Sequence, residues 1–219
     1  DLSRMHRVRR SDSGLVTITG GKLTTYREMA ADTVDEVIEH VHAADVGVDG
    51  WPARSTARMP LIGAAGHDTV LDALEVFPAV PAHVAEHLAS RYGGEARAVM
   101  AMIQKDPALG NTLVAGLPYV DAEAVFAARY EMAGSITDVL SRRTRARIFA
   151  RDDSLAAARR TAELMAAELD WDPERIESEV AEYLASIERE RAAAELPETT
   201  LAGLGIGVAG RSAPVSSGT

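Results

Sequence analysis

The first twenty residues carry apolar positions in patterns that favour extended chain. Residues 5–10 alternate apolar and polar side chains and predict a short strand. Ser-Asp-Ser-Gly at 11–14 is a typical turn sequence. Residues 15–19 form a compact, β-branched run, which predicts a second strand that is buried.

A helix is expected directly after this second strand. Gly20 and Gly21 end the strand, and apolar residues at helical spacing follow. Thr25 and Glu28 have the three-residue spacing of a capping box, so the helix should begin near Tyr26. Its apolar stripe consists of Met29, Val34, Val37, Ile38 and Val41.

The remainder of the chain shows the helical period alone. Pro52 and Pro60 mark residues 43–66 as a connection. Helical spacing then continues to about Glu195, with interruptions at glycine and proline. We expect helices around residues 70–74, 84–88, 99–103, 125–130, 139–140, 155–165 and 173–195.

Acidic and hydroxyl residues supply start signals for the later helices. Asp121 and Asp153 can each act as an N-cap. Asp172 is followed by a proline, which fits an N-cap and a first helical position. Ser135 and Asp138 have the spacing of a capping pair. The expected fold class is therefore mainly α, with short N-terminal strands before a helical domain.

Composition sets limits on the function. The 219 residues are 47% hydrophobic but only 5% aromatic, which predicts a sizeable core built from aliphatic side chains. The absence of cysteine excludes disulfides, iron–sulfur clusters and thiol nucleophiles. A net charge of −10 disfavours nucleic-acid binding.

No apolar run is long enough to span a bilayer, and no signal peptide is recognised. The chain begins with Asp1, as expected of a piece of a longer protein.

Charge is distributed unevenly along the chain. Residues 1–30 hold six basic against three acidic side chains, a net charge of +3, whereas residues 31–219 carry −13. Two interpretations stay open for the basic segment. Charge on a strand edge can simply discourage aggregation, or it can form a local positive site for an anionic ligand.

The segment 17–27 brings together three features that attract an anion. Gly20 and Gly21 allow a ligand to approach the backbone closely. The helix that follows presents free N–H groups and the positive end of its dipole. Lys22 adds a full positive charge at the same place. The alternative is a tight turn with a lysine in solvent.

Several segments are similar to FAD-dependent, aerobic glycerol-3-phosphate dehydrogenase. The run Gly-Gly-Lys-Leu-Thr-Thr-Tyr-Arg at 20–27 is the most specific. The resemblance covers nearly the whole chain except its tail, and it is to the C-terminal portion of that family. The other matching segments are Ser3, Arg4 and His6, then 11–14, 29–35, 117–119, 128–133 and 137–145.

The resemblance implies an oxidoreductase of glycerol metabolism. In that family a hydride passes from sn-glycerol 3-phosphate to FAD, which yields dihydroxyacetone phosphate, and electrons then pass to quinone at the cytoplasmic membrane. The implied protein is cytoplasmic and peripherally attached to that membrane, and a homodimer is left open. Two alternatives remain: an oxygen-using glycerophosphate oxidase, and a stand-alone helical module for interaction or dimerisation.

The resemblance also implies domain boundaries. Residues 1–42 would be the C-terminal edge of an FAD-binding α/β domain, joined by a connection at 43–66 to a helical domain at 67–195. The tail at 196–219 is rich in glycine and serine and is expected to be mobile.

The family's site residues carry over only where the motif matches. Arg4 and Lys22 are expected to bind substrate, since a guanidinium and an ammonium both suit a phosphate. The catalytic acid–base residue stays unassigned, because His6 lies within reach but has no further support. The expected cofactor-binding residues are Thr19, Gly20, Gly21, Lys22, Leu23 and Thr24.

The chain departs from the family in one respect. The family's nucleotide-binding strand–GxGxxG–helix does not occur here, and the glycines at 203–207 follow no predicted strand. We therefore expect the chain alone to be inactive and to bind no FAD.

Two further motifs have ordinary explanations. His-Val-Ala-Glu-His at 83–87 resembles an inverted zincin motif but lacks a third ligand, so no metal is expected. The basic run 142–145 suggests ion pairs or a helix-end packing role, with a phosphate or anionic-lipid contact as the alternative.

Overall fold

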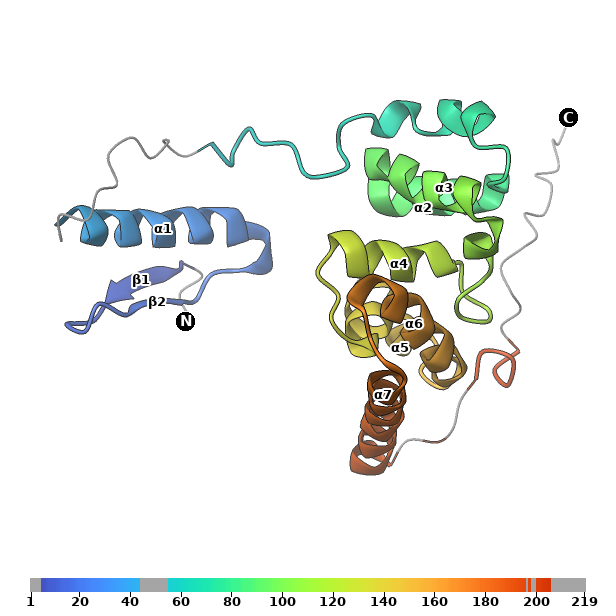
Figure 1. The fold of residues 1–219 in the computed structure, drawn as a ribbon. Coiled ribbons are helices and arrows are strands. Elements are labelled where there is room, and N and C mark those ends of the chain that lie inside the picture. The colour runs from blue at the N-terminus through green and yellow to red at the C-terminus, as the bar shows by residue number, and fades with distance from the viewer. Residues whose placement is uncertain (1–4, 44–54, 196, 198–199, 206–219) are drawn as a thin grey trace, which may run out of the picture. The chain divides into compact units, whose positions relative to one another are not determined.

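The computed structural model describes residues 5–43, 55–195, 197 and 200–205 (Figure 1). The chain divides into two compact units, residues 1–61 and residues 62–219. The first holds two short strands and a helix, and the second is built from helices and turns. The mainly α fold with short N-terminal strands is thereby confirmed. Within the described residues, no helix combines the length and apolarity needed to cross a membrane.

The first unit is a β-hairpin covered by one helix. Strands β1 (Arg7–Arg10) and β2 (Val16–Thr19) pair antiparallel, with Arg7 opposite Thr19 and Arg10 opposite Val16. The 3-10 turn η1 (Leu23–Thr25) leads into α1 (Tyr26–Ala43), which packs against the hairpin.

Both predicted strands exist, but the burial predicted for the second is wrong. In β2 the half-buried Val16 and Ile18 alternate with exposed Thr17 and Thr19. Leu15, just before the strand, is 67% exposed. A two-stranded sheet with a helix against it leaves its other face open, so alternate side chains stay in solvent.

The second unit begins with short helical turns and two antiparallel helices. α2 (Ala82–Tyr92) and α3 (Ala96–Lys105) are joined by η4 (Gly93–Glu95). The expected helix near residues 70–74 is instead two 3-10 turns, η2 (His67–Thr69) and η3 (Leu71–Val76). A further 3-10 turn, η5 (Pro107–Gly110), follows α3.

The rest of the second unit surrounds a central helix, α4 (Asp121–Tyr130), which lies between the α2–α3 pair and the later helices (Figure 1). Every residue from Asp121 to Ala128 is buried. Phe126 joins one apolar cluster with α2 and α3, whereas Val125 joins a second with the later helices. The later elements are the π-helical turn η6 (Asp138–Arg143), α5 (Ala146–Phe149), α6 (Asp153–Leu169) and α7 (Pro173–Ala194).

For the helices of the second unit, the predicted caps were located correctly in two of four cases. Asp172 Oδ1 accepts a hydrogen bond from the Arg175 amide at 2.7 Å, and Ser135 Oγ accepts one from the Asp138 amide at 3.2 Å. Asp121 and Asp153 lie one residue inside their helices instead. Asp121 is drawn away from capping because its carboxylate bonds Arg160 on α6 at 2.9 Å.

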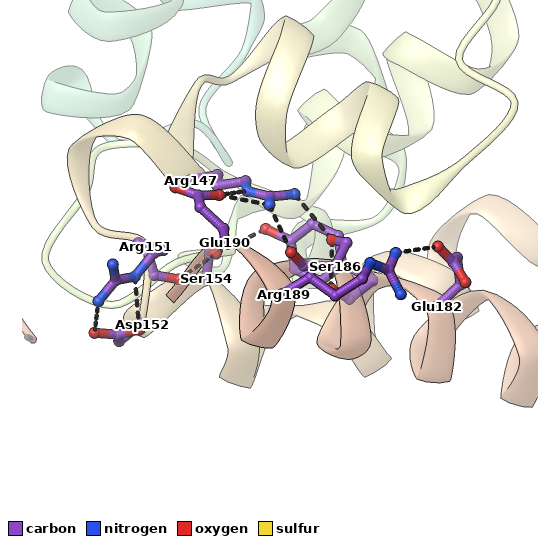
Figure 2. A network of polar contacts seen from close by, with 9 residues as sticks. Arg147, Arg151, Asp152, Ser154, Glu182, Ser186, Arg189 and Glu190 are labelled. Carbon is purple, nitrogen blue, oxygen red and sulfur yellow. Dashed lines mark hydrogen bonds and ion pairs between the residues drawn. The ribbon is translucent and has the colours of Figure 1, made fainter. Parts of the chain in front are cut away.

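Polar side chains attach α7 to the rest of the unit (Figure 2). The Arg147 guanidinium on α5 donates to Glu190 Oε2 at 2.6 Å and to Ser186 Oγ at 2.9 Å. Ser154 on α6 and Tyr183 on α7 share a buried hydrogen bond of 2.7 Å.

Residues 206–219 of the predicted tail lie outside the described residues. Leu201, in the described part of the tail, donates its amide to Asp153 at 2.8 Å.

Candidate functional site

The turn between β2 and α1 requires glycine at both of its first two positions. Gly20 and Gly21 have φ angles of +77° and +80°, in the left-handed region that L-residues rarely adopt. A Cβ on Gly20 would lie 2.8 Å from the Met5 carbonyl oxygen, and one on Gly21 would lie 2.4 Å from Met29 Sδ. The two glycines therefore let the turn pass close to the hairpin and to α1.

Lys22, rather than Thr25, occupies the N-cap position of the helical segment. Its backbone is extended, with φ −139° and ψ 158°. The Thr25 hydroxyl accepts from the Lys22 amide at 3.2 Å and donates to the Lys22 carbonyl at 3.0 Å. The predicted cap at Thr25 is therefore wrong, because its hydroxyl is engaged in closing η1. The α-helix nevertheless begins at Tyr26, as predicted.

Unsatisfied donors gather at this corner. Among the described residues, the amides of Leu23 and Thr24 have no hydrogen-bond partner, and the Lys22 ammonium has no ion pair. All three residues are exposed. Two free N–H groups, the positive end of α1 and a lysine thus present one sign of charge to the same space. This arrangement fits a ligand that carries negative charge.

The turn brings together most of the predicted site residues. Thr19 ends β2 beside the turn, and the other cofactor candidates from Gly20 to Thr24 follow in sequence. Arg4 lies outside the described residues. His6 is held to α1 by a 2.7 Å contact with Asp32, which fixes the start of the hairpin beside Gly21.

The first unit has an incomplete core. None of its described residues is fully buried, and several large apolar side chains near the turn are exposed. Leu23 is 88% exposed and Tyr26 is 61% exposed. Apolar side chains clustered beside a polar site are typical of a surface that another part of a protein covers.

The inverted zincin motif does not form a metal site within the described residues. His83 and Glu86 are exposed. His87 Nε2 lies 3.0 Å from the buried carboxylate of Glu123 on α4. The motif therefore lies on α2 with two exposed side chains, and its last residue, His87, takes part in the contact with α4.

The polar centre around Glu123 was not predicted from the sequence. Its carboxylate accepts hydrogen bonds from the Val120 amide at 2.9 Å and the Tyr92 hydroxyl at 3.1 Å. Arg91 Nε lies 3.0 Å from the same carboxylate. Burial raises the pKa of Tyr92, and the negative charge of Glu123 raises it further. Val120 and Glu123 have the three-residue spacing of a capping box. Valine is not a typical N-cap residue, so the sequence alone does not reveal this pair.

Comparison with known proteins places the helical part of the chain in a family. Residues 54–176 match the family described as the C-terminal domain of alpha-glycerophosphate oxidase. Glycerol-3-phosphate dehydrogenase 2 of Mycobacterium tuberculosis (strain ATCC 25618 / H37Rv) is 36% identical over 196 residues, which cover 86% of this chain and 32% of that protein. The mitochondrial glycerol-3-phosphate dehydrogenase of Mesocricetus auratus is 38% identical over 183 residues, covering 82% of this chain and 24% of that protein. The chain thus spans a third or less of the length of these relatives.

Proposed function

The chain belongs to the family of the C-terminal domain of alpha-glycerophosphate oxidase, and from this premise we propose that it is part of a flavoprotein that oxidises sn-glycerol 3-phosphate to dihydroxyacetone phosphate. The names of its relatives support the substrate. The observation that carries the proposal for this chain is the Gly-Gly-Lys turn, with its unpaired donors before α1.

Each residue of the turn would help to hold the flavin as it is reduced. When bound, FAD supplies the acceptor for a hydride and gains negative charge as it is reduced. The amides of Leu23 and Thr24 would donate hydrogen bonds toward that charge, which is preorganised stabilisation. Gly20 and Gly21 let the backbone approach, and Thr19 positions the turn at the end of β2.

Lys22 has two candidate roles within the proposal. Its ammonium would either add to the positive field at the ring or hold the phosphate of the substrate. Arg4 would contribute a bidentate contact to the same phosphate. No residue of the chain is proposed as the acid–base group that takes the hydroxyl proton of the substrate.

The exposed apolar side chains agree with a role as one part of a larger protein. Leu23 and Tyr26 would be covered by the rest of the FAD-binding domain, of which residues 1–42 would form the C-terminal edge. Residues 43–66 would connect this edge to the helical domain at 67–195, followed by the tail at 196–219. The enzyme would be cytoplasmic and attached peripherally to the cytoplasmic membrane, where quinone accepts the electrons.

Oxygen is the second candidate acceptor, because the matching family is described by an oxidase. The two acceptors require different readouts. A quinone-linked enzyme reduces a quinone analogue under argon, whereas an oxidase consumes oxygen and releases hydrogen peroxide when no quinone is supplied.

A chimera tests the proposed function. Residues 1–219 would replace the matching segment of the Mycobacterium tuberculosis relative. The expected chimera copurifies with FAD and reduces an artificial dye with sn-glycerol 3-phosphate, whereas residues 1–219 alone purify without flavin. A soluble, folded chimera that holds no flavin, or that holds flavin but does not oxidise the substrate, would contradict the proposal.

A further inference from the structure

A cavity rich in arginine lies in the helical unit, on residues that the flavoprotein proposal does not use. Its volume is about 450 Å³, which is within the range for small-ligand sites. Its lining comes from the end of α2, the loops on both sides of α4, and the segment from η6 to α5. The lining includes Arg91, Tyr119, Glu131, Arg142, Arg143 and Arg145.

Two of the four arginines are fixed by contacts within the fold. Arg91 pairs with the buried Glu123, and its guanidinium also donates to the Arg143 carbonyl. The Arg143 guanidinium in turn donates to the Glu131 carbonyl. These two side chains therefore form a rigid, positively charged wall of the cavity.

The other two arginines are available to a ligand. Arg142 pairs with Asp138 at 2.8 Å, but its side chain is 63% exposed, so this pair is weak in water. Arg145 makes no side-chain hydrogen bond or ion pair within the described part of the chain. Arg145 is exposed and lines the same cavity as the other three arginines, so its guanidinium can bind an anion there without first breaking an ion pair.

The backbone that carries these arginines is unusual. Arg145 has a φ of +59°, a left-handed conformation that costs a non-glycine residue about 1 kcal/mol or more. It follows the π-helical turn η6, a form that is frequent at functional sites. The turn and the strained residue together direct Arg142, Arg143 and Arg145 to one cavity.

The cavity also contains an unsatisfied acceptor and an unused hydroxyl. Glu131 Oε2 is buried and has no hydrogen-bond partner. Tyr119 is 7% exposed, and its hydroxyl makes no hydrogen bond within the described residues. A buried carboxylate oxygen without a donor costs free energy unless a ligand supplies one.

We propose that this cavity binds a small phosphate monoester that carries a hydroxyl group. The phosphate would lie on Arg142 and Arg145, with the Tyr119 hydroxyl as a further donor, and the ligand's hydroxyl would donate to Glu131. Guanidinium groups bind phosphate through paired, charge-assisted hydrogen bonds. A ligand with only the phosphate would leave Glu131 unsatisfied and facing a like charge. None of the residues that line the cavity is among those proposed to hold the flavin.

Calorimetric titration of the full chain tests the inference, with 2-hydroxyethyl phosphate as the probe and potassium chloride holding ionic strength constant. We expect binding that weakens about tenfold in Arg142→Gln and in Arg145→Asn, since each removes a charge-assisted contact. Asparagine tolerates the left-handed backbone, so Arg145→Asn should fold. Arg159→Gln is the matched control, because Arg159 pairs with Glu177 outside the cavity.

A second comparison tests Glu131. Wild type should bind 2-hydroxyethyl phosphate more tightly than ethyl phosphate, and Glu131→Met should abolish that preference. Flotation with phosphatidylcholine vesicles containing phosphatidic acid separates the two sources of a phosphate monoester. Vesicle binding that Arg145→Asn abolishes would assign the same chemistry to a lipid headgroup. Binding to neither probe, or binding that the folded arginine variants leave unchanged, would overturn the inference.

Discussion

The hydroxyl of Tyr92, at the end of α2, donates a 3.1 Å hydrogen bond to Glu123 in the buried first turn of α4. The Glu123 side chain is fully shielded from solvent, and the same carboxylate lies 3.0 Å from His87 and from Arg91 Nε. One buried acid thus joins the α2–α3 pair to the central helix.

Glu123→Ala should destabilise the folded chain by about 3–5 kcal/mol, because it leaves buried donors and a partly buried arginine without their partner. Urea unfolding followed by circular dichroism measures the loss. Glu182→Ala is the control, since Glu182 pairs with Arg189 in solvent and should cost less than about 1 kcal/mol. If both substitutions lowered the free energy of unfolding equally, the buried contacts of Glu123 would contribute no more than an exposed ion pair.

Three tyrosines should resist ionisation in the folded chain. Burial raises the pKa of Tyr92, Tyr119 and Tyr183. A raised folded-state pKa means that the stabilisation is complete below the unfolded value, about pH 10, and is lost as the pH rises above it. Tyr92→Phe should therefore lose stability less steeply than wild type above pH 10. The raised pKa of Tyr92 would be contradicted if the free energy of unfolding fell equally steeply with pH in both proteins above pH 10.

Asp138 should contribute to acid sensitivity. Burial acts to raise its pKa, but hydrogen bonds from the Ser135 hydroxyl and the Gly134 amide, with the charge of Arg142, outweigh burial and lower it. A lowered pKa stabilises the folded chain above about pH 4, the unfolded value, and this contribution is lost as the pH falls through the folded pKa. Asp138→Asn should be less stable than wild type at pH 7 by about 1 kcal/mol. The difference should shrink below pH 4, and a constant difference would exclude the linkage.

Gly94→Ala should be strongly destabilising. A Cβ there would lie 1.8 Å from the Ala65 carbonyl oxygen, where the backbone of residues 63–65 passes over η4. We expect a loss of about 2 kcal/mol or more from overpacking. Gly134→Ala is the matched control, because its nearest atom would be 4.0 Å away and its backbone is not left-handed. Thermal unfolding of both variants compares them directly.

Arg147 should hold α7 in place (Figure 2). Its side chain is 17% exposed and bonds both Glu190 and Ser186 on α7. Arg147→Ala should cost about 1–3 kcal/mol, and amide exchange along α7 should accelerate. Arg189→Ala, on the solvent side of the same helix, should change stability by less than about 0.5 kcal/mol. Unchanged exchange along α7 in Arg147→Ala would contradict this role.

Local sequence patterns predicted the order of elements but not the tertiary choices. The proline after Asp172 and the spacing of Ser135 and Asp138 placed their caps correctly, because those signals act within a few residues. Asp121 was misassigned because its preferred partner, Arg160, is 39 residues away. A pair of residues this far apart cannot be recognised in a single sequence.

The two candidate sites also differ in whether their residues are contiguous in the chain. The turn at residues 20–22 lies between the strand and the helix where the sequence predicted it, because these elements are contiguous in the chain. Its role in binding a flavin stays a prediction. The basic run 142–145 was noted with a phosphate contact as one alternative, but the cavity was not foreseen, because its other walls come from the separate segments around Arg91, Tyr119 and Glu131. The π-helical turn that carries Arg142 and Arg143 has no sequence signature that distinguishes it from an α-helix.

The most direct test of the flavin proposal is the reduction potential of FAD in the chimera with and without the Lys22 charge. Lys22→Gln should lower the two-electron potential by about 30 mV, which corresponds to about 1.4 kcal/mol less stabilisation of the reduced, negatively charged ring. The control is Lys105→Gln, since Lys105 is an exposed lysine at the end of α3. The account predicts a shift for Lys22 alone. Equal potentials in wild type and Lys22→Gln, together with unchanged oxidation of glycerol 3-phosphate, would contradict it.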